Sequence, residues 1–194
     1  MDQAEELRNV IKKQNQRTKK PARIITVTSG KGGVGKSNIA VNLAVQFQRM
    51  GLKTIIFDAD IGLANVEVMF GTIPQYSLND LIYHDKEIED IITDGPEGVG
   101  FISGGSGIMG LSNLTLDQIS YLVKSVEKLS VIADIVIVDT GAGISDSVME
   151  FVASSPEILL VTTPEPSSLT DAYSLLKMLY RNADILIFDE PTAV

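Results

Sequence analysis

The chain has 194 residues, 44% of them hydrophobic, which suits one domain with a sizeable core, and none of its apolar runs reaches the length of a membrane span. It contains no cysteine, which excludes disulfides, thiolate metal sites and cysteine-bound iron–sulfur clusters. The formal net charge is −9, and because residues 24–194 carry nine Lys/Arg against 22 Asp/Glu, we expect no broad binding to nucleic acid.

The first 23 residues are basic, with seven Lys/Arg against three Asp/Glu. They begin with an expected amphipathic helix, Asp2–Gln14, in which Leu7, Val10 and Ile11 recur at helical spacing. A polar, charged start is unlike a signal peptide, so we expect a cytoplasmic protein. The basic arm suits an acidic lipid surface or an acidic partner, and a solvated tail is the alternative.

A glycine-rich loop follows the first predicted strand, Arg23–Thr28, and precedes a predicted amphipathic helix, Asn38–Met50. It matches the pattern G-x-x-x-x-G-K-[ST], in which backbone N–H groups and the positive end of the helix face a polyphosphate. We expect Lys36 to neutralise phosphate charge and the Ser37 hydroxyl to ligate Mg²⁺. A chance glycine turn is the alternative. The candidate nucleotide-binding residues of this loop are Gly30, Lys31, Gly32, Gly33, Val34, Gly35, Lys36, Ser37 and Asn38.

Two carboxylates, Asp58 and Asp60, directly follow a second predicted strand, Leu52–Phe57. The carboxyl ends of parallel strands gather beside the phosphate loop, so these side chains are expected near the metal and the γ-phosphate. Alone, the pattern D-x-D is weak evidence, because carboxylates commonly end strands.

The middle of the chain predicts structure without evident chemistry. Val99–Ser103 is a short apolar run. Residues 104–107 are glycine-rich but lack the lysine and the following helix of a second phosphate loop, so we expect a flexible loop there. A helix is predicted over Thr115–Leu129, with Thr115 and Gln118 forming a capping box.

Asp139 ends a third apolar strand, predicted over Ile135–Val138, and is expected to hold Mg²⁺ through water. Gly141 belongs to the glycine loop that follows, and such a loop can move with the γ-phosphate of a bound nucleotide. A satisfied aspartate before a glycine turn is the alternative.

The remaining elements continue the alternation of strands and helices. A strand is predicted over Ile158–Thr162, between helices over Ser145–Ala153 and Ser167–Tyr180. Continuous apolar strands suit a parallel sheet that is covered on both faces. We therefore predict an α/β fold, a doubly wound, mostly parallel sheet of the P-loop NTPase type, with ligands at the carboxyl ends of the strands.

The early lysine makes the phosphate loop more specific. The pattern K-G-G-x-G-K-[ST] resembles the deviant Walker A motif of the MinD/ParA family, and D-x-D-x-G-L-x-N at residues 58–65 is similar to its switch I. The resemblance implies ATP and Mg²⁺ as ligands and a homodimer with ATP. In it, Lys31 reaches the phosphates of the partner copy, with a solvated loop lysine as the alternative. The resemblance also implies that Asp60 positions or activates water and that Asp58 supports the metal. The candidate catalytic residues are thus Lys31, Lys36 and Asp60.

The start of the chain narrows the resemblance. It fits D-Q-A-x-x-L-R, which resembles the N-terminal motif of the FlhG branch of that family. The implied partners are a GTPase similar to FlhF and flagellar basal-body proteins, with slow, partner-stimulated ATP hydrolysis that regulates flagellar number and placement and with peripheral contact to the inner face of the membrane. A helix that packs on the domain is the alternative. The candidate partner-binding residues are Asp2, Gln3, Ala4, Leu7 and Arg8.

The resemblance covers Arg23–Leu176 and then stops. The next residues resemble the Walker B region of ABC ATPases, with Asp189 and Glu190 matching its metal-binding aspartate and water-activating glutamate. No ABC signature precedes them, so these roles do not transfer. We expect a C-terminally truncated MinD-like domain whose sheet gains a strand over Ile185–Phe188. The predicted divisions are residues 1–22, 23–175 and 176–194.

Three alternatives stay open at this point. The chain could be a nucleotide-binding interaction module without useful turnover, an incomplete fragment, or a ParA-like DNA-partitioning ATPase. Turnover that survives the loss of Asp60 would favour the interaction module over the enzyme. The acidic body weighs against DNA partitioning.

Overall fold

The computed structural model describes residues 21–105, 114–179 and 184–189. The strands are β1 (Arg23–Ser29), β2 (Thr54–Ala59), β3 (Thr93–Asp94), β4 (Gly100–Ile102), β5 (Ile135–Ala142), β6 (Glu157–Thr162) and β7 (Asp184–Asp189). The helices are α2 (Lys36–Arg49), α3 (Asn65–Phe70), α4 (Leu78–Tyr83), α5 (Leu116–Leu129), α6 (Asp146–Ala153) and α7 (Pro166–Leu179), with short 3-10 helices η1 (Ile88–Ile91) and η2 (Pro96–Gly98).

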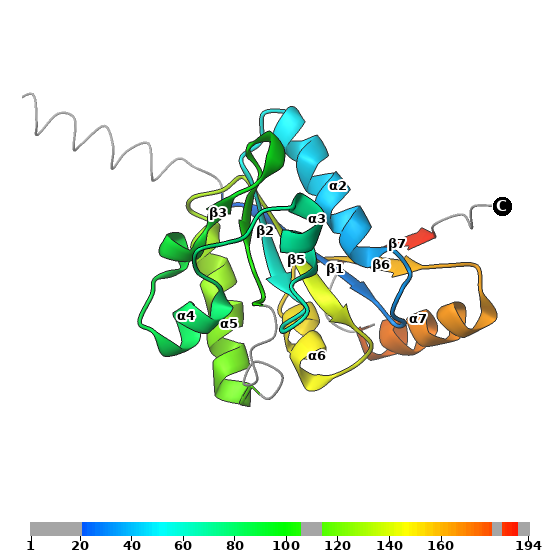
Figure 1. The fold of residues 1–194 in the computed structure, drawn as a ribbon. Helices are drawn as coiled ribbons and strands as arrows, with labels where there is room; N and C mark the ends of the chain where they lie inside the picture. Colours follow the sequence, from blue (N-terminus) through cyan, green and yellow to red (C-terminus); the bar gives the residue numbers. More distant parts are fainter. Residues whose placement is uncertain (1–20, 106–113, 180–183, 190–194) are drawn as a thin grey trace, which may run out of the picture.

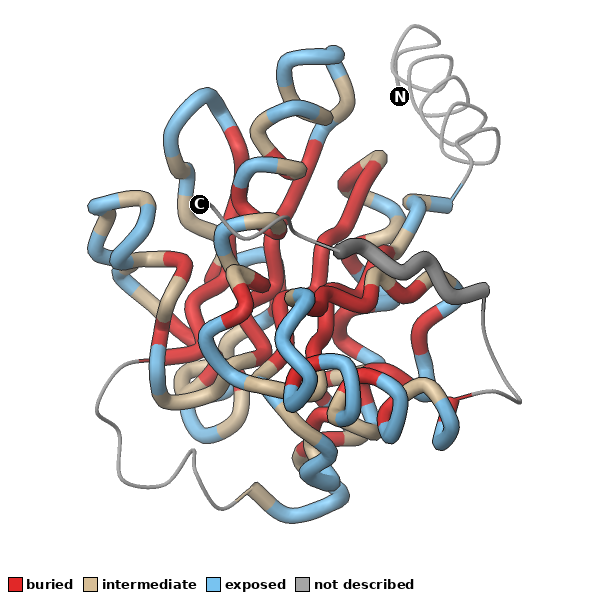
Figure 2. Tube along the Cα trace, turned by 90° about the vertical axis from the view of Figure 1, so that its right-hand side faces the viewer, coloured by how far each residue is buried: buried red, intermediate tan, exposed pale blue. Residues whose placement is uncertain are grey.

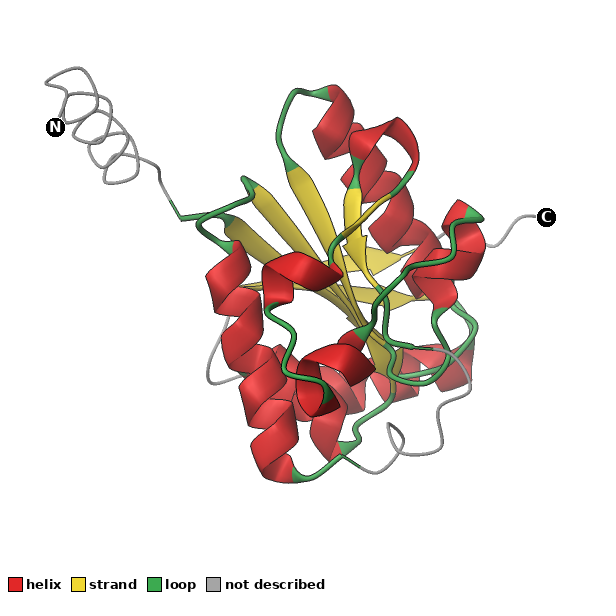
Figure 3. Cartoon of the chain, turned by 60° about the vertical axis from the view of Figure 1, so that its left-hand side comes forward, coloured by secondary structure: helices red, strands yellow, loops and turns green. Residues whose placement is uncertain are grey.

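One sheet organises these elements, with the strand order β3-β4-β2-β5-β1-β6-β7. Every neighbouring pair is parallel except β3 and β4, which form an antiparallel pair at one edge. Figure 1 shows helices on both faces of the sheet, and Figure 3 shows the strands in yellow between layers of helices in red. The predicted α/β fold with a mostly parallel sheet is confirmed.

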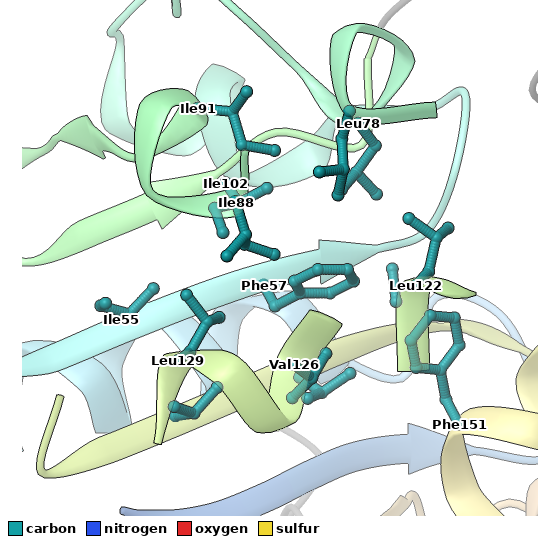
Figure 4. Close-up of a cluster of buried hydrophobic side chains, with 14 of the residues drawn as sticks. Ile55, Phe57, Leu78, Ile88, Ile91, Ile102, Leu122, Val126, Leu129 and Phe151 are labelled. Carbon is teal, nitrogen blue, oxygen red and sulfur yellow. The ribbon is translucent and has the colours of Figure 1, made fainter. Parts of the chain in front are cut away.

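Apolar side chains of the central strands point alternately to the two faces of the sheet. Ile56 packs with residues of α2 on one face, whereas Ile55 and Phe57 pack with residues of α5 and α6 on the other. Figure 4 shows Phe57 within this second group, where its ring centroid lies 5.7 Å from that of Phe151. The buried residues concentrate along the strands (Figure 2), so the loops at the strand ends rest on a well-packed core.

Predicted and observed elements differ mainly at their ends. Helix α2 begins at Lys36 rather than at Asn38, because Gly35 takes a left-handed conformation (φ 87°) and turns the chain directly into the helix. Strand β5 continues past its predicted end to Ala142, because it stays paired with β1 to that point. Both differences move candidate site residues from predicted loops into regular structure.

Helices α3 and α4 are missing from the sequence prediction. Each has six residues, fewer than two turns, so neither shows the apolar period of a longer helix. The capping box formed by Ser77 and Asp80 at the start of α4 is a local signal in this segment for a helix start.

The strand predicted over Ile185–Phe188 is present as β7, which pairs in parallel with β6 at one edge of the sheet. In the described residues, none of the helices is long and apolar enough to cross a bilayer. The candidate partner-binding residues lie outside the described part of the chain, namely Asp2, Gln3, Ala4, Leu7 and Arg8.

Candidate functional site

The phosphate loop connects β1 to α2 at the carboxyl end of the sheet. The first N–H groups of a helix have no intrahelical acceptor, so the start of α2, just after Gly35, favours an anion. Gly30, at the other end of the loop, lies against the main chain of Asp171 and Ala172, where a Cβ atom would collide. Helix α7 therefore supports the loop directly.

A cavity of about 970 Å³ lies over this loop and the ends of β2 and β5. This volume falls within the range of small-molecule sites, roughly 300–1,000 Å³. The cavity brings together eight of the predicted residues, namely Gly32, Gly33, Gly35, Lys36, Ser37, Asn38, Asp60 and Gly141. The predicted residues outside its lining are Gly30, Lys31, Val34, Asp58 and Asp139.

Asp139 is buried next to Lys36. Lys36 Nζ lies 3.6 Å from Oδ1 of Asp139, and the two side chains are 8% and 0% exposed. Neither carboxylate oxygen of Asp139 has a hydrogen-bond partner among the described residues. Burial raises the pKa of Asp139, against the charge of Lys36 and the nearby hydroxyl of Ser37. A buried carboxylate with no close hydrogen bond suits a cation, and together with the Ser37 hydroxyl it fits Mg²⁺, which prefers oxygen ligands.

Asp58 is also buried, and backbone N–H groups occupy both of its oxygens. Oδ1 accepts a hydrogen bond from the N–H of Asp60 and Oδ2 accepts one from the N–H of Val66, each at 3.1 Å. Burial and the charge of Asp139 raise the pKa of Asp58 to about 8. Asp58 therefore braces the connection between β2 and α3, and its support of a metal stays a prediction.

Asp60 is the carboxylate of this pair that lines the cavity. Its Oδ2 accepts a hydrogen bond from Asn65 Nδ2 at 2.8 Å. Its Oδ1 lies against Gly141, because a Cβ atom built on Gly141 would lie 3.2 Å from this oxygen. Burial raises the pKa of Asp60, and the charge of Lys36 works against this shift. Asn65, which the sequence analysis includes only as the last letter of a motif, thus orients the candidate catalytic carboxylate.

Lys31 does not face the cavity of its own chain. Its Nζ donates to Oε2 of Glu165 at 2.8 Å and to Oγ of Ser167 at 3.0 Å, at the start of α7. Neither partner is predictable from the sequence, because both lie more than 130 residues away and belong to no motif. The Lys31 side chain is 38% exposed, so another molecule can approach it on this side of the loop.

The comparisons with known proteins agree with this geometry. The ParA family model, described as NUBPL iron-transfer P-loop NTPase, matches residues 20–188. The chain belongs to this family. Because none of its 194 residues is a cysteine, this ParA-family chain offers no thiolate to iron, and the side chains of its cavity suit phosphate and Mg²⁺.

Two relatives of this ParA-family chain are an antiactivator and a flagellum site-determining protein. It is 43% identical to the antiactivator FleN of Pseudomonas aeruginosa over 162 residues. The aligned region covers 84% of this chain and 58% of FleN. It is 37% identical to the flagellum site-determining protein YlxH of Helicobacter pylori over 190 residues. This aligned region covers 95% of this chain and 64% of YlxH. The chain thus spans about three fifths of the length of these relatives.

Among solved structures, the septum site-determining protein MinD of Pyrococcus horikoshii, complexed with Mg-ADP, matches with a TM-score of 0.74. The two are 29% identical, over 85% of this chain and 68% of MinD. The predicted membership of the MinD/ParA family is thereby confirmed. The chain is a P-loop NTPase of the ParA family, and FleN and YlxH are among its relatives.

Proposed function

We propose that this chain binds ATP with Mg²⁺, hydrolyses the ATP slowly and dimerises when ATP is bound. The observation that carries the proposal is the placement of Lys36 and Asp60 in one cavity, with the carboxylate of Asp139 buried beside Lys36 and without a close hydrogen bond in the described residues. The Mg-ADP in the related MinD structure supports this choice of nucleotide and metal.

In the proposed reaction the chain's own groups bind and orient. The ammonium of Lys36 and the first N–H groups of α2 balance phosphate charge. Ser37 and Asp139 would hold Mg²⁺, which when bound neutralises charge on the phosphates. Asp60, held by Asn65, accepts a hydrogen bond from the attacking water and orients it toward the γ-phosphate.

Lys31 has a role between two copies in this proposal. It is held at the edge of the loop by Glu165 and Ser167 and does not line its own cavity. A second copy that faces this cavity would bring its Lys31 toward the bound phosphates, where a positive charge favours the ATP state over the ADP state. Dimerisation would then report which nucleotide is bound.

The test is the solution mass and the ATP turnover of the chain with ADP and with ATP plus Mg²⁺. We expect a dimer with ATP only, loss of that dimer in Lys31→Ala, and its accumulation in Asp60→Ala, with turnover at least about 100-fold lower in Asp60→Ala. The exposed Lys53 gives a matched control, because Lys53→Ala removes the same charge away from the cavity.

Two outcomes would contradict the proposal in different ways. A monomer under every condition, with no nucleotide bound, would show that these residues do not form a working nucleotide switch. Nucleotide binding with turnover that survives Asp60→Ala would show that the proposed hydrolytic role of Asp60 is wrong, whereas nucleotide binding without turnover in the unaltered chain would favour an interaction module.

We further propose that the switch regulates flagellar number and placement through a GTPase similar to FlhF, in the cytoplasm and in peripheral contact with the membrane. The identities to FleN and YlxH support this biological setting. The segment D-Q-A-x-x-L-R supports the choice of a GTPase similar to FlhF as the partner.

We expect Leu7→Ala combined with Arg8→Ala to abolish stimulation of the partner's GTP hydrolysis while ATP binding stays unchanged. Unaltered stimulation by the double variant would remove the segment from the interface.

A further inference from the structure

The end of β4 is tied to α3 through one short hydrogen bond. Ser103 follows β4 directly, is buried, and donates from Oγ to Oε2 of Glu67 at 2.6 Å. The same hydroxyl accepts a hydrogen bond from the N–H of Gly105 at 3.1 Å, so it is held on both sides. Glu67 lies in the first turn of α3, and α3 begins just after the loop that carries Asp60. Ser103 therefore connects the end of β4 to the segment behind the candidate catalytic carboxylate.

Gly104 makes a second, direct contact with that segment. A Cβ atom on Gly104 would lie 3.0 Å from the carbonyl oxygen of Asp58 and 3.3 Å from that of Asp60. Such distances are tighter than ordinary side-chain contacts, so a side chain here would push the two backbones apart. Glycine is needed at this position because of the close approach of two main chains.

The loop between β2 and α3 needs such support. Ala64, which precedes α3, has a left-handed conformation with φ 48° and ψ 47°, an unfavourable one for a residue with a side chain. Strained backbone persists where its surroundings over-determine it. On the far side, the Asp60 carboxylate lies against Gly141. The loop is thus enclosed between the end of β4 and the end of β5.

We propose that Glu67, Ser103 and Gly104, which we call the β4 clamp, are positioning residues that hold Asp60 in place for ATP hydrolysis. None of the three lines the cavity, so they act on the reaction through Asp60 and not through contact with nucleotide. The kinetic part of this inference rests on the proposed ATPase function, whereas the positional part does not.

The kinetic test compares Glu67→Ala, Ser103→Ala and Gly104→Ala with the unaltered chain. We expect kcat for ATP hydrolysis to fall about tenfold in each, because a small displacement of a positioned group is costly in rate. The KM for ATP and the Kd for ADP should stay within about twofold, since the phosphate loop is untouched. Glu67→Gln retains an acceptor for the Ser103 hydroxyl and should restore most of kcat.

Gly100→Ala is the matched control. It adds a methyl group at the start of β4, where Cβ would lie 3.2 Å from Ile92 and 3.3 Å from Ile55, a similar crowding away from Asp60. It should lower stability without changing kcat. Unchanged kcat in the three clamp variants, or an equal fall in Gly100→Ala, would overturn the proposal.

Amide hydrogen exchange tests the position of the loop without any turnover. We expect Glu67→Ala and Gly104→Ala to speed the exchange of the Asp60 and Val66 N–H groups by at least about tenfold, and Gly100→Ala to leave both unchanged. Equal exchange in all variants would refute the clamp. If the unaltered chain does not hydrolyse ATP, the proposed function fails, and the exchange data still decide whether the clamp exists.

Discussion

Gly30 shows how closely the phosphate loop is fitted to its support. A Cβ atom on Gly30 would lie only 2.6 Å from the backbone nitrogen of Ala172 and closer still to the main chain of Asp171. We expect Gly30→Ala to lower the free energy of unfolding by about 2–3 kcal/mol and to weaken nucleotide binding, because the loop must move off α7. Urea unfolding and a nucleotide titration measure the two effects.

Gly32→Ala is the control for this prediction. Its added Cβ would meet its nearest neighbour, Ala142, at 3.9 Å, an ordinary contact, so the free energy of unfolding should change by less than about 0.5 kcal/mol. Equal destabilisation by the two variants would show that loss of glycine flexibility matters here and that crowding against α7 does not.

At the same scale, the sequence predicts the residues whose chemistry depends on local spacing. Lys36 is identified by the phosphate-loop motif, and Asp60 and Asp139 are identified because they follow predicted apolar strands. The sequence cannot predict the Lys31–Glu165 or Ser103–Glu67 hydrogen bonds, because each joins residues far apart in the chain with no repeating pattern. The sequence also cannot show which of the two neighbouring carboxylates, Asp58 or Asp60, accepts hydrogen bonds from backbone N–H groups with both of its oxygens.

Helix α5 provides a prediction about an element. Thr115 and Gln118 form the capping box expected from the sequence, in which the Thr115 hydroxyl accepts from the N–H of Gln118 and the Gln118 side chain accepts from the N–H of Thr115. We expect Thr115→Ala to cost about 1 kcal/mol of stability, measured by urea unfolding, because one N–H of the first turn loses its partner.

Thr115→Ser retains the capping hydroxyl and should behave like the unaltered chain. An effect of the same size in Thr115→Ser and Thr115→Ala would mean that the methyl group of Thr115, and not its cap, contributes the stability. Elements of this kind are predictable because a cap and a long apolar period coincide, whereas α3 and α4 are too short to show such a period.

For the whole molecule, the buried carboxylates predict how stability depends on pH when Mg²⁺ is removed with EDTA. The pKa of an unfolded aspartate is about 3.9, and in the folded chain burial raises that of Asp58 to about 8. Between these values the folded state holds a proton that the unfolded state has lost, so stability falls as pH rises. Burial also raises the pKa values of Asp60 and Asp139, so these two groups change stability with pH in the same sense.

The measurement is the free energy of unfolding in urea at pH 6, 7 and 8. One such group gives a fall of at most about 1.4 kcal/mol per pH unit. Asp58→Asn should flatten the slope, although it lowers stability at every pH because an amide has one acceptor oxygen for the two N–H groups of Asp60 and Val66. Stability that rises across this window would contradict the assignment of a protonated Asp58.

The order of strands in the sheet has a consequence for the chain while it is being synthesised. Strand β1 lies between β5 and β6, and Arg23 pairs with Ile135 while Ile25 pairs with Glu157. The strand that leads into the phosphate loop is thus made before both of its neighbours, which follow more than 100 residues later. Pairings at such separation form slowly. On the ribosome, a nascent chain would hold β1 without either neighbouring strand throughout that interval.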